Sequence, residues 1–286
     1  MKLSVITVSW KVRDKLKVNL EELFKSRTDF NWEVFVVDNN SADGTAEMIR
    51  SEFPRVRLIV NDDNFGFARA NNQALQQVTG DFILLLNPDM KVNSQTLRQT
   101  VAWLQNNPQA WVAGGRLIDE ADKNIASVRR FPALTDQLAI VLKLPHLFSK
   151  ILNKYLCVDF DYGQAAKVDS VRGSFFAIRR SALEKVGLLD ERFFIWFEEV
   201  DYCRRVYAAG GEVWYTPAAS CLDLVGASFK QLPRGRAQRY FRNSQLKYFV
   251  KWHGLGRAGL LAAAWLPVLL FLPLAKVFKI SGRAKT

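Results

Sequence analysis

Short apolar runs alternate with longer amphipathic segments through the first third of the chain. Four of these runs lie at 3–9, 33–38, 55–60 and 81–86, and a segment of helical length follows each one. Such continuous apolar runs are typical of strands that are buried between two helical layers. The pattern predicts parallel strands joined by helical crossovers in an α/β sheet, where ligands bind beyond the carboxyl ends of the strands.

The pattern becomes less regular towards the middle of the chain. The stretch KVDSVRGSFFAIRR (167–180) predicts a further strand, and TDQLAIVLKLPHLFSKILNKYL (135–156) predicts an amphipathic helical region that breaks at Pro145. The stretch FFIWFEEVDYCRRVYAAG (193–210) indicates a helix that is entered from an aromatic segment and ended by two glycines. These elements extend the α/β pattern beyond the first four strands.

The charge distribution sets the C-terminal part apart from the rest. Residues 1–223 carry 28 Lys and Arg against 28 Asp and Glu, whereas residues 224–286 carry 12 Lys and Arg and no acid. A tail of this kind favours polyanions, either nucleic acid or an anionic membrane surface. Its uncharged stretch at 259–275 is short for a spanning helix. We therefore expect an interfacial or re-entrant membrane segment and no nucleic acid; the alternative is a helix buried on the domain.

Glycine, cysteine and N-terminal patterns exclude several other classes. The first glycine is Gly44, so neither a GxGxxG loop nor a Walker A loop can follow the first strand. The three cysteines are widely spaced and form no CxxC pair, so neither a zinc site nor a disulfide framework is indicated. The N-terminus lacks the long apolar core of a signal peptide, and we expect the protein to stay in the cytosol.

Two polar clusters follow predicted strands, and each has a structural alternative. Asp38 in VVDNNSADGT can accept hydrogen bonds from a ribose or a base, but Ser41 or Asp43 would equally serve as a helix N-cap. Asp89 in LLLNPDM can supply the carboxylate with which a divalent cation meets a diphosphate. A plain turn explains the same Asn-Pro-Asp triplet.

A third cluster, WFEEVDYCRR, opens a predicted helix. Glu198 and Asp201 fall on one helical face, and Asp201 can reach Arg204 or Arg205 within a turn. Like charges and the adjacent aromatic residues raise the pKa of a carboxyl group, which suits a general base near neutral pH. The alternative is a helix N-terminus that carries acids to match its dipole.

Taken together, these pieces resemble the inverting glycosyltransferases of family 2, and especially their rhamnosyltransferase-like branch. The resemblance covers most of residues 3–228 and rests on SVITVSW, VVDNNSADGT, NDDNFGFARANNQAL, LLLNPDM, VRGSFFAIRRSALEKVGLLDERFFIWFEEVDYCRR and YTPAASCLDLVGAS. It implies a GT-A nucleotide-diphospho-sugar transferase fold over 1–228, a Rossmann-like mixed sheet flanked by helices. A basic, membrane-associating helical tail over 229–286 would complete the chain.

The resemblance also implies a site. Asp89 would be the metal-binding carboxylate of a DxD-type motif for Mg²⁺ or Mn²⁺, with Asn87 in the place of the first acid. The substrate would be a dTDP- or UDP-linked sugar. The nucleotide-sugar site would be formed by Thr7, Ser9, Asp38, Asn40, Asn64, Gly66, Phe67, Asn71 and Asn87.

Two residues depart from the family pattern. The family's acid pair is Glu-Asp with a second Asp two residues on, and this chain has Glu198, Glu199 and Asp201 as its catalytic cluster. Glu199 falls on the base position, with Glu198 as the alternative. Asp223 stands where the family often carries a histidine near the metal, and a carboxylate remains a competent ligand for Mg²⁺ or Mn²⁺.

For function, the resemblance implies transfer of one sugar, L-rhamnose from dTDP-rhamnose, onto a lipid-linked saccharide of a bacterial envelope glycan such as O-antigen or capsule. The enzyme would lie on the cytoplasmic face of the inner membrane, peripheral or monotopic. The main alternative is a catalytically silent, membrane-bound scaffold, which the departures at Glu199 and Asp223 motivate. A nucleic-acid-binding protein that uses the basic tail is a second alternative.

Overall fold

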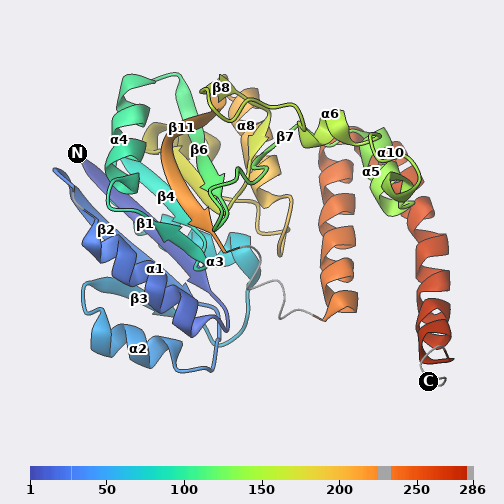
Figure 1. Cartoon of the computed structure of the whole chain (residues 1–286), viewed down its shortest axis with the longest axis horizontal. Helices are drawn as coiled ribbons and strands as arrows, with labels where there is room; N and C mark the ends of the chain where they lie inside the picture. Colours follow the sequence, from blue (N-terminus) through green and yellow to red (C-terminus); the bar gives the residue numbers. More distant parts are fainter. Residues whose placement is uncertain (27, 225–232, 282–286) are drawn as a thin grey trace.

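The computed structural model describes residues 1–26, 28–224 and 233–281, with side chains of the last helix described over 235–269. An α/β body carries a group of helices at one end, where α5 (Leu134–Val141), α6 (Asn153–Leu156) and α10 (Arg234–Ser281) lie together (Figure 1). Among the described residues, no helix combines the length and the apolar character needed to cross a bilayer.

The centre of the fold is a mixed sheet of nine strands. Its parallel half has the order β3-β2-β1-β4, β10 pairs antiparallel with β4, and the order continues as β6, β11 and β5, with β8 beside β11. Strands β7 and β9 form a separate pair. The bounds are β1 Lys2–Ser9, β2 Asn31–Asp38, β3 Val56–Val60, β4 Phe82–Leu86, β5 Met90–Val92, β6 Ala110–Ile118, β7 Val128–Arg129, β8 Ala166–Lys167, β9 Ser170–Val171, β10 Phe175–Arg179 and β11 Glu212–Asp223.

The strand register brings the polar segments to one edge of the sheet. Ser9 is paired with Asp38, so the segments that follow β1 and β2 begin at the same level. On the other side of β4, Asp223 of β11 is paired with Met90, which places it beside Asp89. This arrangement is the physical basis for a site at the strand ends.

Helices cover both faces of the sheet. Side chains of α1, α2 and α4 pack on one face, and those of α3, α7 and α8 pack on the other. Apolar strands buried on both sides explain the continuous hydrophobic runs of the sequence. The bounds are α1 Arg13–Lys25, α2 Thr45–Glu52, α3 Gly66–Leu75, α4 Thr96–Asn106, α7 Arg180–Val186 and α8 Glu198–Ala208.

A third apolar cluster joins the C-terminal helix to the body. Helix α10 (Arg234–Ser281) has non-helical torsions at Gly254, where φ is 81°, and the chain turns back there. Helix α5 (Leu134–Val141) packs between its two halves, with Tyr248 and Phe249 from the first half and Leu261 and Trp265 from the second. The start of α10 therefore belongs to the folded body.

The structure confirms the four expected strands as β1 to β4, and the expected helix after the aromatic segment as α8. The region around 135–156 forms α5, the 3₁₀ turn η1 (Leu144–His146) and α6 (Asn153–Leu156). The first helix ends at Val141, four residues before the expected break at Pro145, which lies inside η1. The expected strand at 167–180 is split into β8, β9 and β10. The boundary expected at 228/229 lies outside the described residues.

Candidate functional site

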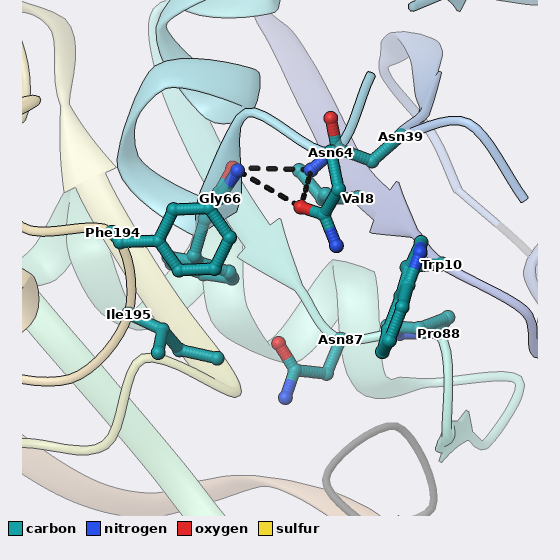
Figure 2. Close-up of a pocket in the computed structure, with 10 residues that line it drawn as sticks. Val8, Trp10, Asn39, Asn64, Gly66, Asn87, Pro88, Phe194 and Ile195 are labelled. Carbon is teal, nitrogen blue, oxygen red and sulfur yellow. Dashed lines mark hydrogen bonds between the residues drawn. The ribbon is translucent and has the colours of Figure 1, made fainter. Parts of the chain in front are cut away.

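A cleft of about 580 Å³ opens beyond the carboxyl ends of β1 and β4. Figure 2 shows Trp10 and Pro88 on one side of it, Phe194 and Ile195 on the other, and Asn87 between them. The cleft is lined by Val8, Trp10, Asn39, Asn64, Gly66, Phe67, Asn87, Pro88, Phe194 and Ile195.

A network of asparagines shapes the upper wall of the cleft (Figure 2). Asn39 Nδ2 donates to Asn64 Oδ1 at 2.9 Å and to the Gly66 carbonyl at 3.3 Å. The Gly66 amide donates to Asn64 Oδ1 at 3.0 Å, and Asn61 Nδ2 donates to Asn39 Oδ1 at 3.0 Å. Since Asn39 is buried, these bonds fix the loop after β2 to the start of α3.

Gly66 allows the start of α3 to lie close to Phe194 in the cleft. Its φ is 80°, and a Cβ on this residue would collide with the carbonyl oxygen and the ring of Phe194. Only glycine adopts this conformation without strain and leaves room for Phe194. The Phe67 amide donates to the same Phe194 carbonyl at 2.7 Å, so the loop before α8 is attached directly to α3.

A second cavity of about 470 Å³ adjoins the first, and the two share Phe67, Asn87 and Ile195 as lining residues. Its other walls are different in character, because they carry an arginine and two carboxylates. These walls are formed by Arg172, Gly173, Ser174, Trp196, Glu198 and Glu199. A ligand in the cleft would therefore lie next to the carboxylates without sharing their cavity.

Both carboxylates of the second cavity are desolvated. Burial raises the pKa of Glu198 well above its ordinary value, and the charge of Glu199 raises it further. Burial also raises the pKa of Glu199, although the cations Arg172 and Arg129 oppose the shift. One oxygen of each group, Oε2, has no hydrogen-bond partner among the residues that the structure describes. A raised pKa and a free oxygen are properties of a general base that works near neutral pH.

The backbone that presents this pair is strained. Trp196 and Phe197 have φ of 64° and 71°, a region that bulky residues rarely adopt. The first half of α10 holds this segment. The ring centroids of Phe197 and Tyr248 lie 5.4 Å apart, and Ser244 Oγ donates to the Ile195 carbonyl at 2.8 Å. Such strain persists where surrounding contacts fix it, and it is concentrated at functional sites.

Asp201 lines neither of the two cavities. It is fully buried, and Arg205 Nε donates to its Oδ2 at 2.9 Å. Its Oδ1 accepts from Trp252 Nε1 at 2.8 Å and is 2.7 Å from Lys251 Nζ. Asp201 thus connects α8 to α10, and the structure does not bring it into the cavity with the glutamates.

Asp89 and Asp223 are buried neighbours: Asp89 directly precedes β5, and Asp223 of β11 is paired with Met90. Arg172 Nη1 lies 3.1 Å from Asp223 Oδ2, so this carboxylate has a cationic partner. No group of three or more His, Cys, Asp or Glu side chains suited to a metal occurs in the part of the chain that the structure describes. Two carboxylates fit Mg²⁺ or Mn²⁺ only if diphosphate oxygens complete the coordination, which is an arrangement that Mg²⁺ commonly uses.

The structure places the expected nucleotide-sugar residues in two groups. Asn64, Gly66, Phe67 and Asn87 line the cleft. The others point elsewhere or are covered: Asn40 Nδ2 donates to the Asp62 carbonyl and Asn71 Nδ2 to the Phe67 carbonyl. Thr7, Ser9 and Asp38 are buried and do not line the cleft, and burial raises the pKa of Asp38.

The wall residues that the sequence-based site did not include are mostly apolar or small, but Trp10, Asn39, Phe194 and Arg172 are among them. Asn39 lies between Asp38 and Asn40, which the sequence predicted for the site, and no periodicity distinguishes its side chain from theirs. Trp10 directly follows the end of β1, a position that could have drawn attention to it. Phe194 and Arg172 reach the site through long-range packing, which leaves no local signal.

The model of glycosyl transferase family 2 matches residues 4–187, and the chain belongs to this family. Two of its curated relatives are rhamnosyltransferases. N-acetylglucosaminyl-diphospho-decaprenol L-rhamnosyltransferase of Mycobacterium tuberculosis is 24% identical over 238 residues, which are 79% of this chain and 78% of that protein. Rhamnosyltransferase WbbL of Escherichia coli is 28% identical over 222 residues, which are 75% of this chain and 80% of that protein.

Solved structures show the same fold. GalNAc-T7 with UDP, GalNAc and Mn²⁺ superposes with a TM-score of 0.61 at 15% identity, over 86% of this chain and 48% of that one. Mannosyltransferase PcManGT from Pyrobaculum calidifontis, in complex with GDP-Man and Mn²⁺, gives a TM-score of 0.57 at 18% identity, over 98% and 79%. The chain is therefore a rhamnosyltransferase-like family 2 transferase with a GT-A fold.

Proposed function

We propose that this protein transfers a single sugar, L-rhamnose from dTDP-rhamnose, with inversion onto a lipid-linked saccharide of a bacterial envelope glycan. The observation that carries the proposal is the pair of adjoining cavities, one lined by asparagines and the other by two glutamates, Glu198 and Glu199. A donor in the first cavity and an acceptor hydroxyl in the second would meet at Asn87. The sugar and the lipid-linked acceptor rest on the names of the rhamnosyltransferase relatives.

In the proposed reaction, ionised Glu199 accepts the proton of the acceptor hydroxyl on a carboxylate oxygen. The hydroxyl oxygen attacks the anomeric carbon from the face opposite the diphosphate. The bond from that carbon to the diphosphate oxygen breaks, and the leaving group takes the electron pair. Because one displacement occurs, the configuration inverts and no covalent enzyme intermediate forms.

Asp89 and Asp223 are the residues that would hold Mg²⁺ or Mn²⁺. Such a cation, when bound, stabilises the negative charge that develops on the departing diphosphate. Arg172 must release Asp223 or share it for this to occur, because it is the partner of that carboxylate in the structure. Arg172 also lines the glutamate cavity, so it connects the two halves of the site.

The proposed setting is the cytoplasmic face of the inner membrane, with the protein peripheral or monotopic. The 12 cations and absent acids of residues 224–286 support attraction to an anionic surface. Exposed leucines in the second half of α10 support partial insertion. The acceptor, a saccharide on a polyprenyl diphosphate, would be reached at the same surface.

A transfer assay tests the proposal. The full chain is incubated with Mn²⁺, a synthetic polyprenyl-diphosphate-linked N-acetylglucosamine, and dTDP-rhamnose, UDP-N-acetylglucosamine or GDP-mannose in turn. The expected result is glycolipid product from dTDP-rhamnose alone, with the inverted anomeric configuration by NMR. Product from another donor would refute the sugar assignment, and retention of configuration would refute the mechanism.

One observation favours a catalytically silent scaffold as the second candidate: the ion pair between Arg172 and Asp223 occupies a carboxylate that the reaction would need. The same assay separates the two candidates. Metal-dependent hydrolysis or transfer of any nucleotide sugar excludes the silent scaffold, and absence of both with every donor favours it.

A further inference from the structure

Residues 142–154, named here the 142–154 segment, expose apolar side chains that a folded protein normally buries. Leu147 is 77% exposed and Phe148 is 61% exposed, and Leu142 and Ile151 are exposed as well. The buried side chains of Val141 and Leu152 hold the two ends of this segment on the protein. The segment is therefore a fixed protrusion whose apolar side chains point away from the core.

These residues belong to a larger pattern. Of the 13 large hydrophobic residues that are exposed in the described part of the chain, only Met1, Val18 and Val60 lie outside residues 142–158 and helix α10. Scattered exposed hydrophobics need no explanation, but a concentration at one end of a molecule indicates an interaction surface. In Figure 1 that end is formed by α5, α6 and α10, opposite the helices α1 and α2.

Contacts between α5 and α10 bring the two apolar elements onto one body. Gln245 Nε2 donates to Gln137 Oε1 at 2.8 Å, and Trp265 Nε1 donates to Gln245 Oε1 at 2.8 Å. All three side chains are buried, so these bonds lock α5 to both halves of α10. Leu255, 78% exposed, and Leu260 then extend the exposed apolar set beyond the 142–154 segment.

The charge of this end identifies what it contacts. Residues 137–158 contain three lysines and no acid, and residues 224–286 contain no acid either. Lys143, Lys150 and Lys154 are exposed beside the apolar side chains. A second copy of the chain that docked through the same surface would present like charges to it, whereas anionic headgroups attract lysines and allow leucine and phenylalanine to enter the acyl boundary.

We propose that the 142–154 segment is a second membrane-docking element, which inserts Leu147 and Phe148 into an anionic lipid surface beside the second half of α10. Two weak contacts that act together give stable anchoring where one gives only marginal binding. The inference rests on the proposed function, because a lipid-linked acceptor brings the protein to a membrane. It adds a docking element far from the C-terminal tail in sequence.

Co-sedimentation of the full chain with vesicles tests this proposal. Vesicles are made of phosphatidylcholine alone or with 30% phosphatidylglycerol. We expect binding to the anionic vesicles and at least about tenfold weaker partition for the double variant Leu147→Glu/Phe148→Glu. The triple variant Lys143→Gln/Lys150→Gln/Lys154→Gln should lose a similar factor on anionic vesicles only. Val18→Glu on α1 is the matched control, and it should bind like the wild type.

Three results would overturn the proposal: no binding of the wild type to anionic vesicles, wild-type binding by the double variant, or a dimer in sedimentation velocity that the double variant dissociates. The last result would assign the surface to a second copy of the chain. Affinity for dTDP with Mn²⁺ is measured on every sample. Retained dTDP affinity with lost vesicle binding confines the defect to docking, whereas absent dTDP affinity in the wild type would instead count against the proposed transferase.

Discussion

The two adjoining cavities of the site are stabilised in different ways. In the cleft, Asn39 and Asn64 come from loops at the ends of neighbouring strands, Gly66 begins α3, and their polar groups bond to one another. In the second cavity, Glu198 is buried and Glu199 is half-buried, and each has one buried oxygen without a hydrogen-bond partner in the described part of the chain. The cleft is thus a satisfied network, while the glutamate cavity contains groups whose burial costs free energy.

The difference follows from what supports each region. The sheet edge itself orders the cleft, because adjacent parallel strands end there. The glutamates depend on a strained aromatic segment that α10 holds in place from the far end of the chain. The buried carboxyl groups proposed for function therefore lower the stability of the glutamate cavity, as perturbed catalytic groups commonly do. In the cleft, the hydrogen bonds that shape the site also stabilise the fold.

Glu199→Gln should have the largest effect, and it should separate the function of the glutamate cavity from that of the cleft. Removing the general base should lower kcat by about 10³-fold, while affinity for the nucleotide in the cleft stays within about twofold. Glu198→Gln is the matched control at the neighbouring position. Steady-state kinetics with the lipid-linked acceptor measure both variants. A dead Glu198→Gln beside a nearly normal Glu199→Gln would move the base by one residue.

Asp201→Asn tests the support behind the glutamates. It leaves Arg205 and Lys251 without their buried carboxylate, so we expect a loss of about 3 kcal/mol in the free energy of unfolding. Urea denaturation measures it. Asp14→Asn, which removes a fully solvated carboxylate on α1, should change stability by less than about 0.5 kcal/mol. Equal effects of the two variants would show that α10 does not fix the start of α8.

Arg172→Gln should change the pH dependence of activity through the pKa of Glu199. Burial raises the pKa of Glu199, and the Arg172 cation opposes that shift together with Arg129, while Glu198 is the neighbouring acid. Activity requires ionised Glu199, so it is lost as the pH falls through this pKa. Loss of the cation raises the pKa, and the acid limb of kcat/KM should move to higher pH. Arg172→Lys keeps a cation and should restore the acid limb to its wild-type pH. Arg98→Gln on α4 is the control. An acid limb that Arg172→Gln leaves in place would exclude an effect of Arg172 on the pKa of Glu199.

Glu198→Gln should have the smallest effect, and it should be stabilising. Because burial raises the pKa of Glu198 in the folded protein, the folded state binds more protons than the unfolded one, and stability falls as the pH rises above the ordinary value of 4.5. Glutamine removes this loss, so the Tm should rise by about 2 °C at pH 7 and be unchanged at pH 4. A lower Tm at pH 7 would mean that Glu198 is ionised and paired.

Local patterns predicted the sheet and the helix of the glutamates because each signal lies within one element. The strands β1 to β4 are continuous apolar runs, and Glu198 and Glu199 directly open α8. The cleft was predicted only in part. Asp38 and Asn39 are adjacent at the end of β2, and alternation along the chain cannot tell which of them turns its side chain into the cavity.

Long-range contacts account for what the sequence left open. The ring centroids of Tyr240 and Phe194 lie 4.3 Å apart, although 46 positions separate the two residues, so the start of α10 supports a residue of the cleft wall. The tail was expected as a separate membrane element, and its first half is instead packed into the body. Docking of its second half to a lipid surface stays a prediction.

The central claim is that the cleft binds the nucleotide with the help of a metal while the glutamates act only on the acceptor. Calorimetric titration of dTDP, with and without Mn²⁺, into the wild type, Asp89→Ala and Glu199→Gln tests it most directly. We predict that Mn²⁺ tightens binding at least about tenfold in the wild type and in Glu199→Gln, and not in Asp89→Ala. Equal binding by all three proteins, or a loss confined to Glu199→Gln, would contradict the account.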